Sequence, residues 1–423
     1  MKRHHRAVER SDRSLLKWVS GPTIAGLLDS SSYIYLILGT NELTFYPLVL
    51  LLKLAVLLGM AGNLDHARRF LPFGAVALSG ILVSSFANGS LLMDAVKPVA
   101  VLASVILTLT IVGRDIRGYA MGMAVSSALV CTGYLASVAT GAIESTGDRH
   151  DFFAGSHPNL GGELISSTLV MAAFVLRPRY FLPLAVTALY CTFLLQSRTS
   201  TIAIIISIAC FCAFHSSIRI GWRNTALTMI ALILGLVVVG AVFAAVQQDT
   251  LQALYSFLFD SVFLVEDQYR GGSSGFSGRD QHWLTAMQLI SENPFLGAGP
   301  DFAARRESLQ PHNWLLYAVS QFGIFGWAMA ALFVTATATA IKREPLRLIA
   351  LIPLLIPWLL NDRFLNFNAY PFVIYILAFM PFAVAKVRRP KAVCNPREAY
   401  RQSAPLSTRR LQPLRRQYGQ PAQ

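Results

Sequence analysis

Long apolar runs separated by short polar segments dominate the chain from about residue 20 to residue 386. An α-helix needs about 20 mostly apolar residues to cross the hydrocarbon core of a bilayer. The runs are much longer than the alternating segments of roughly ten residues that form a membrane β-barrel. The pattern therefore predicts an all-α fold, a polytopic transmembrane helical bundle in which each helix satisfies its own backbone hydrogen bonds.

About twelve spans are expected. They cover residues 20–38, 43–61, 70–87, 95–113, 119–141, 158–176, 180–196, 200–215, 225–246, 314–341, 346–360 and 370–386. The first span is the weakest, because Asp29 and the serines at 30–32 interrupt its apolar run.

Positive charge alternates between the segments that connect these spans. Every second connection is basic, with Arg68 and Arg69, Arg114 and Arg117, Arg177 and Arg179, Arg219 and Arg223, and then Lys342, Arg343 and Arg347. The segments 41–43, 87–90 and 143–153 are poor in positive charge. Because cytoplasmic loops carry the excess of Lys and Arg, the alternation predicts that both termini are cytoplasmic.

The same topology predicts five regions. Residues 1–19 form a basic cytoplasmic N-terminus, 20–246 hold spans 1–9, 247–313 form a periplasmic loop with short amphipathic helices, 314–386 hold spans 10–12, and 387–423 form a basic, disordered cytoplasmic tail. No cleavable signal peptide is evident at the start, so the first span is expected to direct insertion.

Composition and charge agree with a membrane protein. The 423 residues are 54% hydrophobic and 14% charged, with a mean hydropathy of +0.51. The net charge of +14 could indicate nucleic acid, but the basic residues gather at the ends and in short loops. Topology and contact with anionic lipid explain this distribution, so membrane lipids and no nucleic acid are expected as partners.

The predicted outer loop contains the strongest candidate chemistry. From Ser277 the sequence has a helix start, with Ser277 as N-cap and Asp280 as its capping-box partner, and Asn293-Pro294 ends the helix. Arg279 lies in the first turn, where the helix dipole disfavours a cation. An anionic ligand such as a phosphate would reverse this effect, whereas pairing with an acidic neighbour is the alternative.

Two further residues face outward in the same topology. His312 stands where the outer loop meets a span, and a histidine can act as a base near neutral pH, although a hydrogen-bonded interfacial role is the alternative. Arg198 lies between two apolar runs, where an arginine needs a polar cavity or an anion unless it reaches the headgroups. Secondary candidates for substrate binding are Arg270, His157, Asn159, Arg305 and Arg306.

Several familiar motifs are missing from the sequence. It has no GxxxxGK[ST] phosphate loop, no HExxH and no paired CxxC, and the long loop has no DxD-like pair. No metal and no cofactor are therefore expected. The five cysteines lie in apolar runs or in the tail, so no disulfide framework is expected.

Taken in order, these segments resemble the superfamily of O-antigen ligases and O-antigen or exopolysaccharide polymerases. The similarity is most specific between Ser277 and Trp327, where SGRxxxW, a short helix, NPFLGAG, HNWLL and GIFGW follow one another. The SR pair at Ser197-Arg198 and the HPNLGG segment at 157–162 also look like motifs of this family.

The resemblance implies a metal-independent, inverting glycosyltransferase of lipopolysaccharide or exopolysaccharide biosynthesis in a bacterial inner membrane. It would take a glycan from undecaprenyl diphosphate at the periplasmic face and move it to a lipid- or glycan-linked sugar acceptor, in company with other polysaccharide assembly proteins. Carried over by position, Arg198 and Arg279 would bind the donor diphosphate. His312 would activate the acceptor hydroxyl.

Three questions stay open at this point. A ligase and a polymerase share donor chemistry and differ in acceptor, and nothing in the sequence separates them. A transporter or flippase of lipid-linked saccharides would use ionisable residues deep in the spans, and those are few, chiefly Asp29, Lys53 and Lys97 near span ends. A scaffold recruited through the basic tail is the third alternative.

Overall fold

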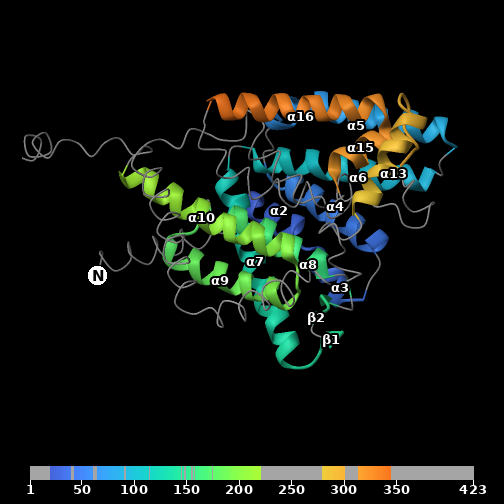
Figure 1. Ribbon diagram of the computed structural model, residues 1–423. Helices are drawn as coiled ribbons and strands as arrows, with labels where there is room; N and C mark the ends of the chain where they lie inside the picture. The colour runs from blue at the N-terminus through green and yellow to red at the C-terminus, as the bar shows by residue number, and fades with distance from the viewer. Residues whose placement is uncertain are drawn as a thin grey trace, which may run out of the picture. The chain divides into compact units, whose positions relative to one another are not determined.

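The computed structural model describes residues 20–39, 42–60, 64–89, 92–113, 115–143, 145–146, 149–153, 156, 158–173, 175–220, 279–300 and 313–343. The helices in these ranges are α2 (Gly21–Asp29), α3 (Ser32–Ile37), α4 (Glu42–Leu58), α5 (Asp65–Ala87), α6 (Leu92–Val112), α7 (Ile116–Ala139), α8 (Pro158–Ala172), α9 (Pro178–Leu194), α10 (Arg198–Ile220), α13 (Arg279–Glu292), α15 (Trp314–Phe322) and α16 (Ile324–Arg343). Figure 1 shows this helical architecture. The prediction of a helical fold is confirmed, with one small addition, a hairpin of the two-residue strands β1 (Ser145–Thr146) and β2 (Arg149–His150).

Three helices in the described part are long and apolar enough to cross a membrane. Their apolar stretches are Phe70–Ala87, Ala95–Val112 and Ile116–Ala139, and shorter apolar helices cover Thr44–Leu58, Arg198–Cys212 and Ile324–Thr339. These helices support a membrane location. The count of twelve spans stays a prediction, since the proposed spans 225–246, 346–360 and 370–386 and both terminal regions lie outside the described residues.

Two of the predicted spans are each divided into two helices. The first, expected at 20–38, ends its initial helix α2 at Asp29 and resumes as α3 at Ser32. The tenth, expected at 314–341, is divided at Gly323 into α15 and α16. The indole of Trp314 lies 4.8 Å from the ring of Phe333, so the first turn of α15 lies beside the middle of α16. The chain therefore folds back at Gly323 instead of crossing as one helix.

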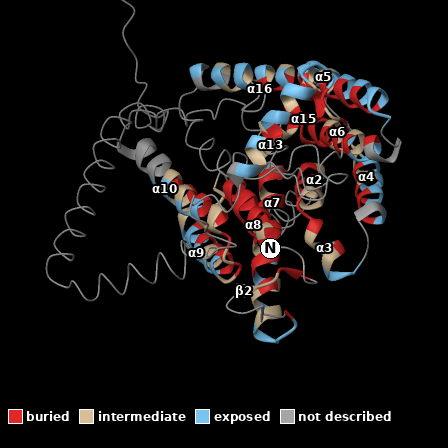
Figure 2. Ribbon diagram, turned by 45° about the vertical axis from the view of Figure 1, so that its right-hand side comes forward, coloured by how far each residue is buried: buried red, intermediate tan, exposed pale blue. Residues whose placement is uncertain are grey.

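Helix α8 is the most buried element. Every residue from Leu160 to Ala172 is buried, and α7, α9 and α10 pack around it. Figure 2 shows the buried residues concentrated on α7 and α8, whereas α4, α5 and α9 carry exposed faces. Apolar side chains such as Leu51, Leu58 and Val186 are exposed on those faces, as expected for helices that contact lipid.

Glycines bring α2 and α7 into backbone contact. A Cβ atom added to Gly122 would lie 2.1 Å from the carbonyl oxygen of Thr23, and one added to Gly26 would lie 2.2 Å from that of Tyr119. Neither distance leaves room for a side chain. Small residues at such contacts allow membrane helices to approach closely, so these two glycines set the spacing of α2 and α7.

Gly122→Ala should therefore destabilise the bundle, by about 1–3 kcal/mol if the overpacked helices separate locally. Thermal unfolding of the purified protein in detergent measures the effect. Gly133→Ala on the same helix is the matched control, because its Cβ would lie 3.7 Å from the Phe153 ring, an ordinary contact. Equal unfolding temperatures for the two variants would contradict this account of the interface.

Candidate functional site

The helix that carries Arg279 forms as the sequence predicts. Arg279 is the first residue of α13, and the helix ends at Glu292, directly before Asn293-Pro294. Ala286 and Leu289 are buried against the protein, whereas Leu284 and Met287 are 67% and 52% exposed. Exposed apolar side chains are typical of a short helix that lies at a membrane surface, and that location stays a prediction. Ser277, the predicted N-cap, lies outside the described residues.

The loop that follows α13 is fastened to the C-terminal end of α15. The backbone N–H of Ala298 donates to the carbonyl of Ser320 at 2.8 Å, and that of Gly299 donates to Gln321 at 3.1 Å. In return, the N–H of Ile324 donates to the carbonyl of Phe295 at 3.0 Å. The last carbonyls of a helix have no partner within the helix, so the NPFLGAG segment supplies the cap for α15.

Glycines make this contact possible. Gly297 has φ +69°, and a Cβ atom there would lie 2.2 Å from the carbonyl oxygen of Gln321. Gly323 has φ +53°, and its Cβ would lie 2.4 Å from the carbonyl oxygen of Phe295. Gly326 packs in the same way on Ala318. Gly297 and Gly323 thus allow the NPFLGAG segment to pack against the end of α15, and Gly326 allows α15 and α16 to pack together.

The opposite end of α15 is fixed by Asn313. Its Oδ1 atom accepts hydrogen bonds from the backbone N–H groups of Leu315 and Leu316, at 3.0 and 3.2 Å. This is an N-cap, worth about 1 kcal/mol in typical helices. In the HNWLL segment, Asn313 therefore caps the helix and the buried Trp314 anchors it, which sequence reasoning missed. His312 immediately precedes this cap and lies outside the described residues.

Two polar side chains from α5 connect to the same junction. Ser84 Oγ donates to the carbonyl of Gln321 at 2.7 Å, and Asn88 Nδ2 donates to the carbonyl of Gly297 at 3.0 Å. Asn88 belongs to the 87–90 segment, which the charge pattern places outside. The NPFLGAG loop therefore lies at the end of α5 that the sequence assigns to the outer side.

A second pair of motif segments meets at the starts of α8 and α10. A Cβ on Gly162 would lie 2.4 Å from Ser197 Oγ and 2.7 Å from Ser200 Oγ, and Ser197 Oγ donates to Ser200 Oγ at 2.9 Å. The HPNLGG segment thus packs directly against the SR pair. Asn159 lies partly buried in the first turn of α8, and its neighbour His157 is outside the described residues.

Arg198 and Arg279 share a backbone setting. Each is the first residue of its helix, α10 and α13 respectively. The helix dipole disfavours a cation there, whereas exposed N–H groups together with a guanidinium suit an anion. The sequence predicted a position in the first turn of a helix for Arg279 only. Convergence of Arg198, Arg279 and His312 in one site stays a prediction, and Arg270, Arg305 and Arg306 lie outside the described residues.

If the NPFLGAG loop is packed on α15 in this way, Gly297→Ala should lower the unfolding temperature, because the added Cβ collides with the carbonyl of Gln321. Gly141→Ala is the control, since Gly141 also has positive φ, +70°, but nothing lies within 4 Å of its Cβ position. That control separates backbone strain, about 1–2 kcal/mol, from the collision. Equal unfolding temperatures for the two variants would rule out the packing role.

Comparison with protein families gives one match in this part of the chain. Residues 183–331 match the model of the O-antigen ligase family. The matched region contains Arg198, Arg279, the capped helix α15 and the first part of α16. No curated protein and no solved structure matches the chain. The family match confirms the resemblance to O-antigen ligases and polymerases, a family that implies an enzyme of the glycosyltransferase type.

Proposed function

Because residues 183–331 match the O-antigen ligase family, we propose that this chain is a glycosyltransferase of the periplasmic face that uses an undecaprenyl-diphosphate-linked glycan as donor. The acceptor is a sugar hydroxyl on lipid A core or on another lipid-linked repeat unit. The observation that carries the proposal is the placement of two arginines, Arg198 and Arg279, each at the first position of a helix inside the matched region.

The two helix starts suit a diphosphate. Each start offers backbone N–H groups that have no partner within the helix, and each carries a guanidinium that can form paired hydrogen bonds with phosphate oxygens. When the sugar–phosphate bond breaks, negative charge grows on the leaving diphosphate. Donors already aimed at that charge lower the barrier without a metal ion.

The proposed chemistry is a single displacement. The acceptor hydroxyl oxygen attacks the anomeric carbon, and the bond from that carbon to the phosphate oxygen breaks with its electron pair on undecaprenyl diphosphate. His312 takes the hydroxyl proton as general base. Attack opposite the leaving group inverts the anomeric configuration. Arg270, His157, Asn159, Arg305 and Arg306 are secondary candidates for contacts with the glycan or diphosphate.

The position of the NPFLGAG loop supports this assignment. The loop joins α13, which Arg279 begins, to α15, whose cap Asn313 directly follows His312. Hydrogen bonds from Ala298 and Gly299 hold the loop on α15. Reacting groups must be held within a fraction of an ångström for efficient transfer, and a rigid connection between the two elements serves that requirement.

Arg198→Ala, Arg279→Ala and His312→Ala should each lower glycan transfer by at least about 100-fold, because each removes charge stabilisation or proton transfer in the transition state. Transfer is measured with purified protein and lipid-linked glycan. Arg179→Ala is the control, since Arg179 lies in a predicted cytoplasmic connection beside the Tyr180 ring. Near wild-type transfer by all three site variants would overturn the proposal.

The acceptor is identified by giving the purified enzyme two acceptors separately, lipid A core and a second lipid-linked repeat unit, with EDTA present throughout. We expect a covalent glycan product with one of the two, and an unchanged rate with EDTA. Movement of intact donor across vesicles without any product would instead favour the transporter or flippase alternative.

A further inference from the structure

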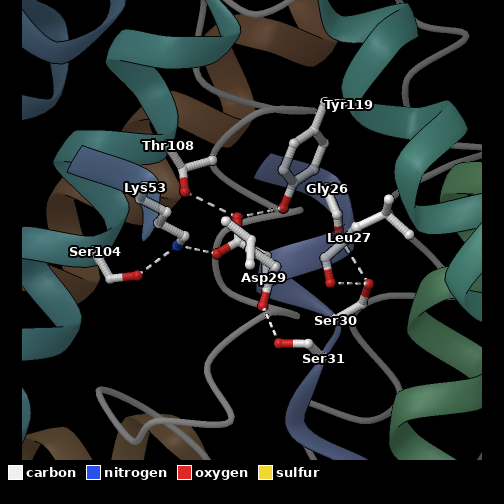
Figure 3. A network of polar contacts seen from close by, with 10 residues as sticks. Gly26, Leu27, Asp29, Ser30, Ser31, Lys53, Ser104, Thr108 and Tyr119 are labelled. Carbon is white, nitrogen blue, oxygen red and sulfur yellow. Dashed lines mark hydrogen bonds and ion pairs between the residues drawn. The ribbon is translucent and has the colours of Figure 1, made fainter. Parts of the chain in front are cut away.

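Asp29 and Lys53, which were expected near span ends, instead lie inside the bundle in a charged and hydrogen-bonded cluster that takes no part in the proposed reaction. The carboxylate of Asp29 pairs with the ammonium of Lys53. The same carboxylate accepts hydrogen bonds from Thr108 Oγ1 at 2.8 Å and from Tyr119 Oη at 3.0 Å. Lys53 Nζ also donates to Ser104 Oγ at 2.6 Å. Figure 3 shows the side chains of Lys53, Ser104, Thr108 and Tyr119 around Asp29 of α2, and they come from α4, α6 and α7.

The cluster is shielded from solvent. The side chain of Lys53 is 0% exposed and that of Asp29 is 5% exposed, and Thr108 and Tyr119 are both 0% exposed. Lys53 lies in the interior of α4, an apolar helix, and Thr108 lies within one of the long apolar stretches. An unpaired charge in such a place is strongly unfavourable, so each of these two ions depends on the other.

Asp29 also marks the break in the first predicted span. Helix α2 ends at Asp29, and the two following serines turn their hydroxyl groups back onto its last carbonyls, Ser30 Oγ to Gly26 at 2.7 Å and Ser31 Oγ to Leu28 at 2.6 Å. From α7, Ser126 Oγ donates to the carbonyl of Ser30 at 3.2 Å. The C-terminal end of a helix carries partial negative charge, which favours the nearby Lys53 ammonium.

From these contacts we infer that Asp29 and Lys53 form an ionic clasp inside the membrane, which fixes the break between α2 and α3 and fastens α2 to α4, α6 and α7. Helix α2 has only 9 residues, about 13 Å of helix, which is too short to cross a bilayer alone. Its position must come from its neighbours. The clasp supplies directional contacts at its C-terminal end, and the glycine contact with α7 supplies close packing along its side.

The proposed role of the Asp29–Lys53 pair is structural. It is therefore tested by the unfolding temperature, and the test does not depend on glycan transfer. Asp29→Asn and Lys53→Met each leave one charge buried without its partner, whereas the double variant removes both. Each single variant should lower the unfolding temperature in detergent by roughly 5–10 °C, and the double variant should recover most of that loss. Lys97→Met on α6 is the matched control, because Lys97 is exposed.

The inference would be overturned if the single variants unfolded at the wild-type temperature. It would also be overturned if the unfolding temperature of the double variant fell by the sum of the two single decreases. If the single variants do not fold, Thr108→Val and Tyr119→Phe test the same cluster with both charges retained. Each should lower the unfolding temperature by about 2–4 °C. Thr132→Val is the control for these two variants, since Thr132 is exposed and its hydroxyl donates to a carbonyl of its own helix. Equal decreases in unfolding temperature for Thr108→Val and Thr132→Val would refute the inference.

Discussion

Inside a bilayer no water is available to satisfy a charge or an interrupted helix, and this constraint governs the described structure. The chain interrupts its helices at two places within expected spans, after Asp29 and at Gly323. At the first, the hydroxyl groups of Ser30 and Ser31 donate to the last carbonyls of α2, and Ser126 of α7 donates to the carbonyl of Ser30. At the second, the backbone of the NPFLGAG loop does so. Each interruption is stable only because a distant segment supplies the missing partners.

The two interruptions have different roles. The one at Asp29 joins four helices in the interior and belongs to the scaffold. The one at Gly323 joins the end of α5 that is predicted to face outward, the loop after α13 and the helix hairpin α15–α16. Since α13 begins with Arg279 and α15 follows His312, this second junction connects the proposed chemistry to the bundle. A division between rigid support and reactive groups is common where loops carry function on a fixed framework.

Much of this fold could be predicted from apolar patterning. The expected spans 43–61, 70–87 and 95–113 correspond to α4, α5 and α6 with modest differences at the ends. The fold-back at Gly323 could not be predicted in this way, because apolar residues flank the glycine on both sides and hydropathy does not distinguish a turn from a helix. The pairing of Asp29 with Lys53 was also missed, since the two residues are 24 positions apart and lie on different helices whose relative register the sequence does not give.

For the site, helix-start signals near Ser277 predicted that Arg279 begins a helix, and the motif order predicted the family. The contacts between motifs were not readable from the sequence. Gly162 against Ser197, and Gly297 against Gln321, depend on backbone approach over long sequence separations. A short glycine-containing motif indicates that another segment packs closely against the backbone, but it does not indicate which segment.

Helix α15 is held at both of its ends. Hydrogen bonds hold Gly299 at one end of α15, and the cap at Asn313 sets the other end. With both ends fixed by residues outside its own nine positions, α15 cannot slide along its axis or unwind a turn without losing contacts at one end or the other.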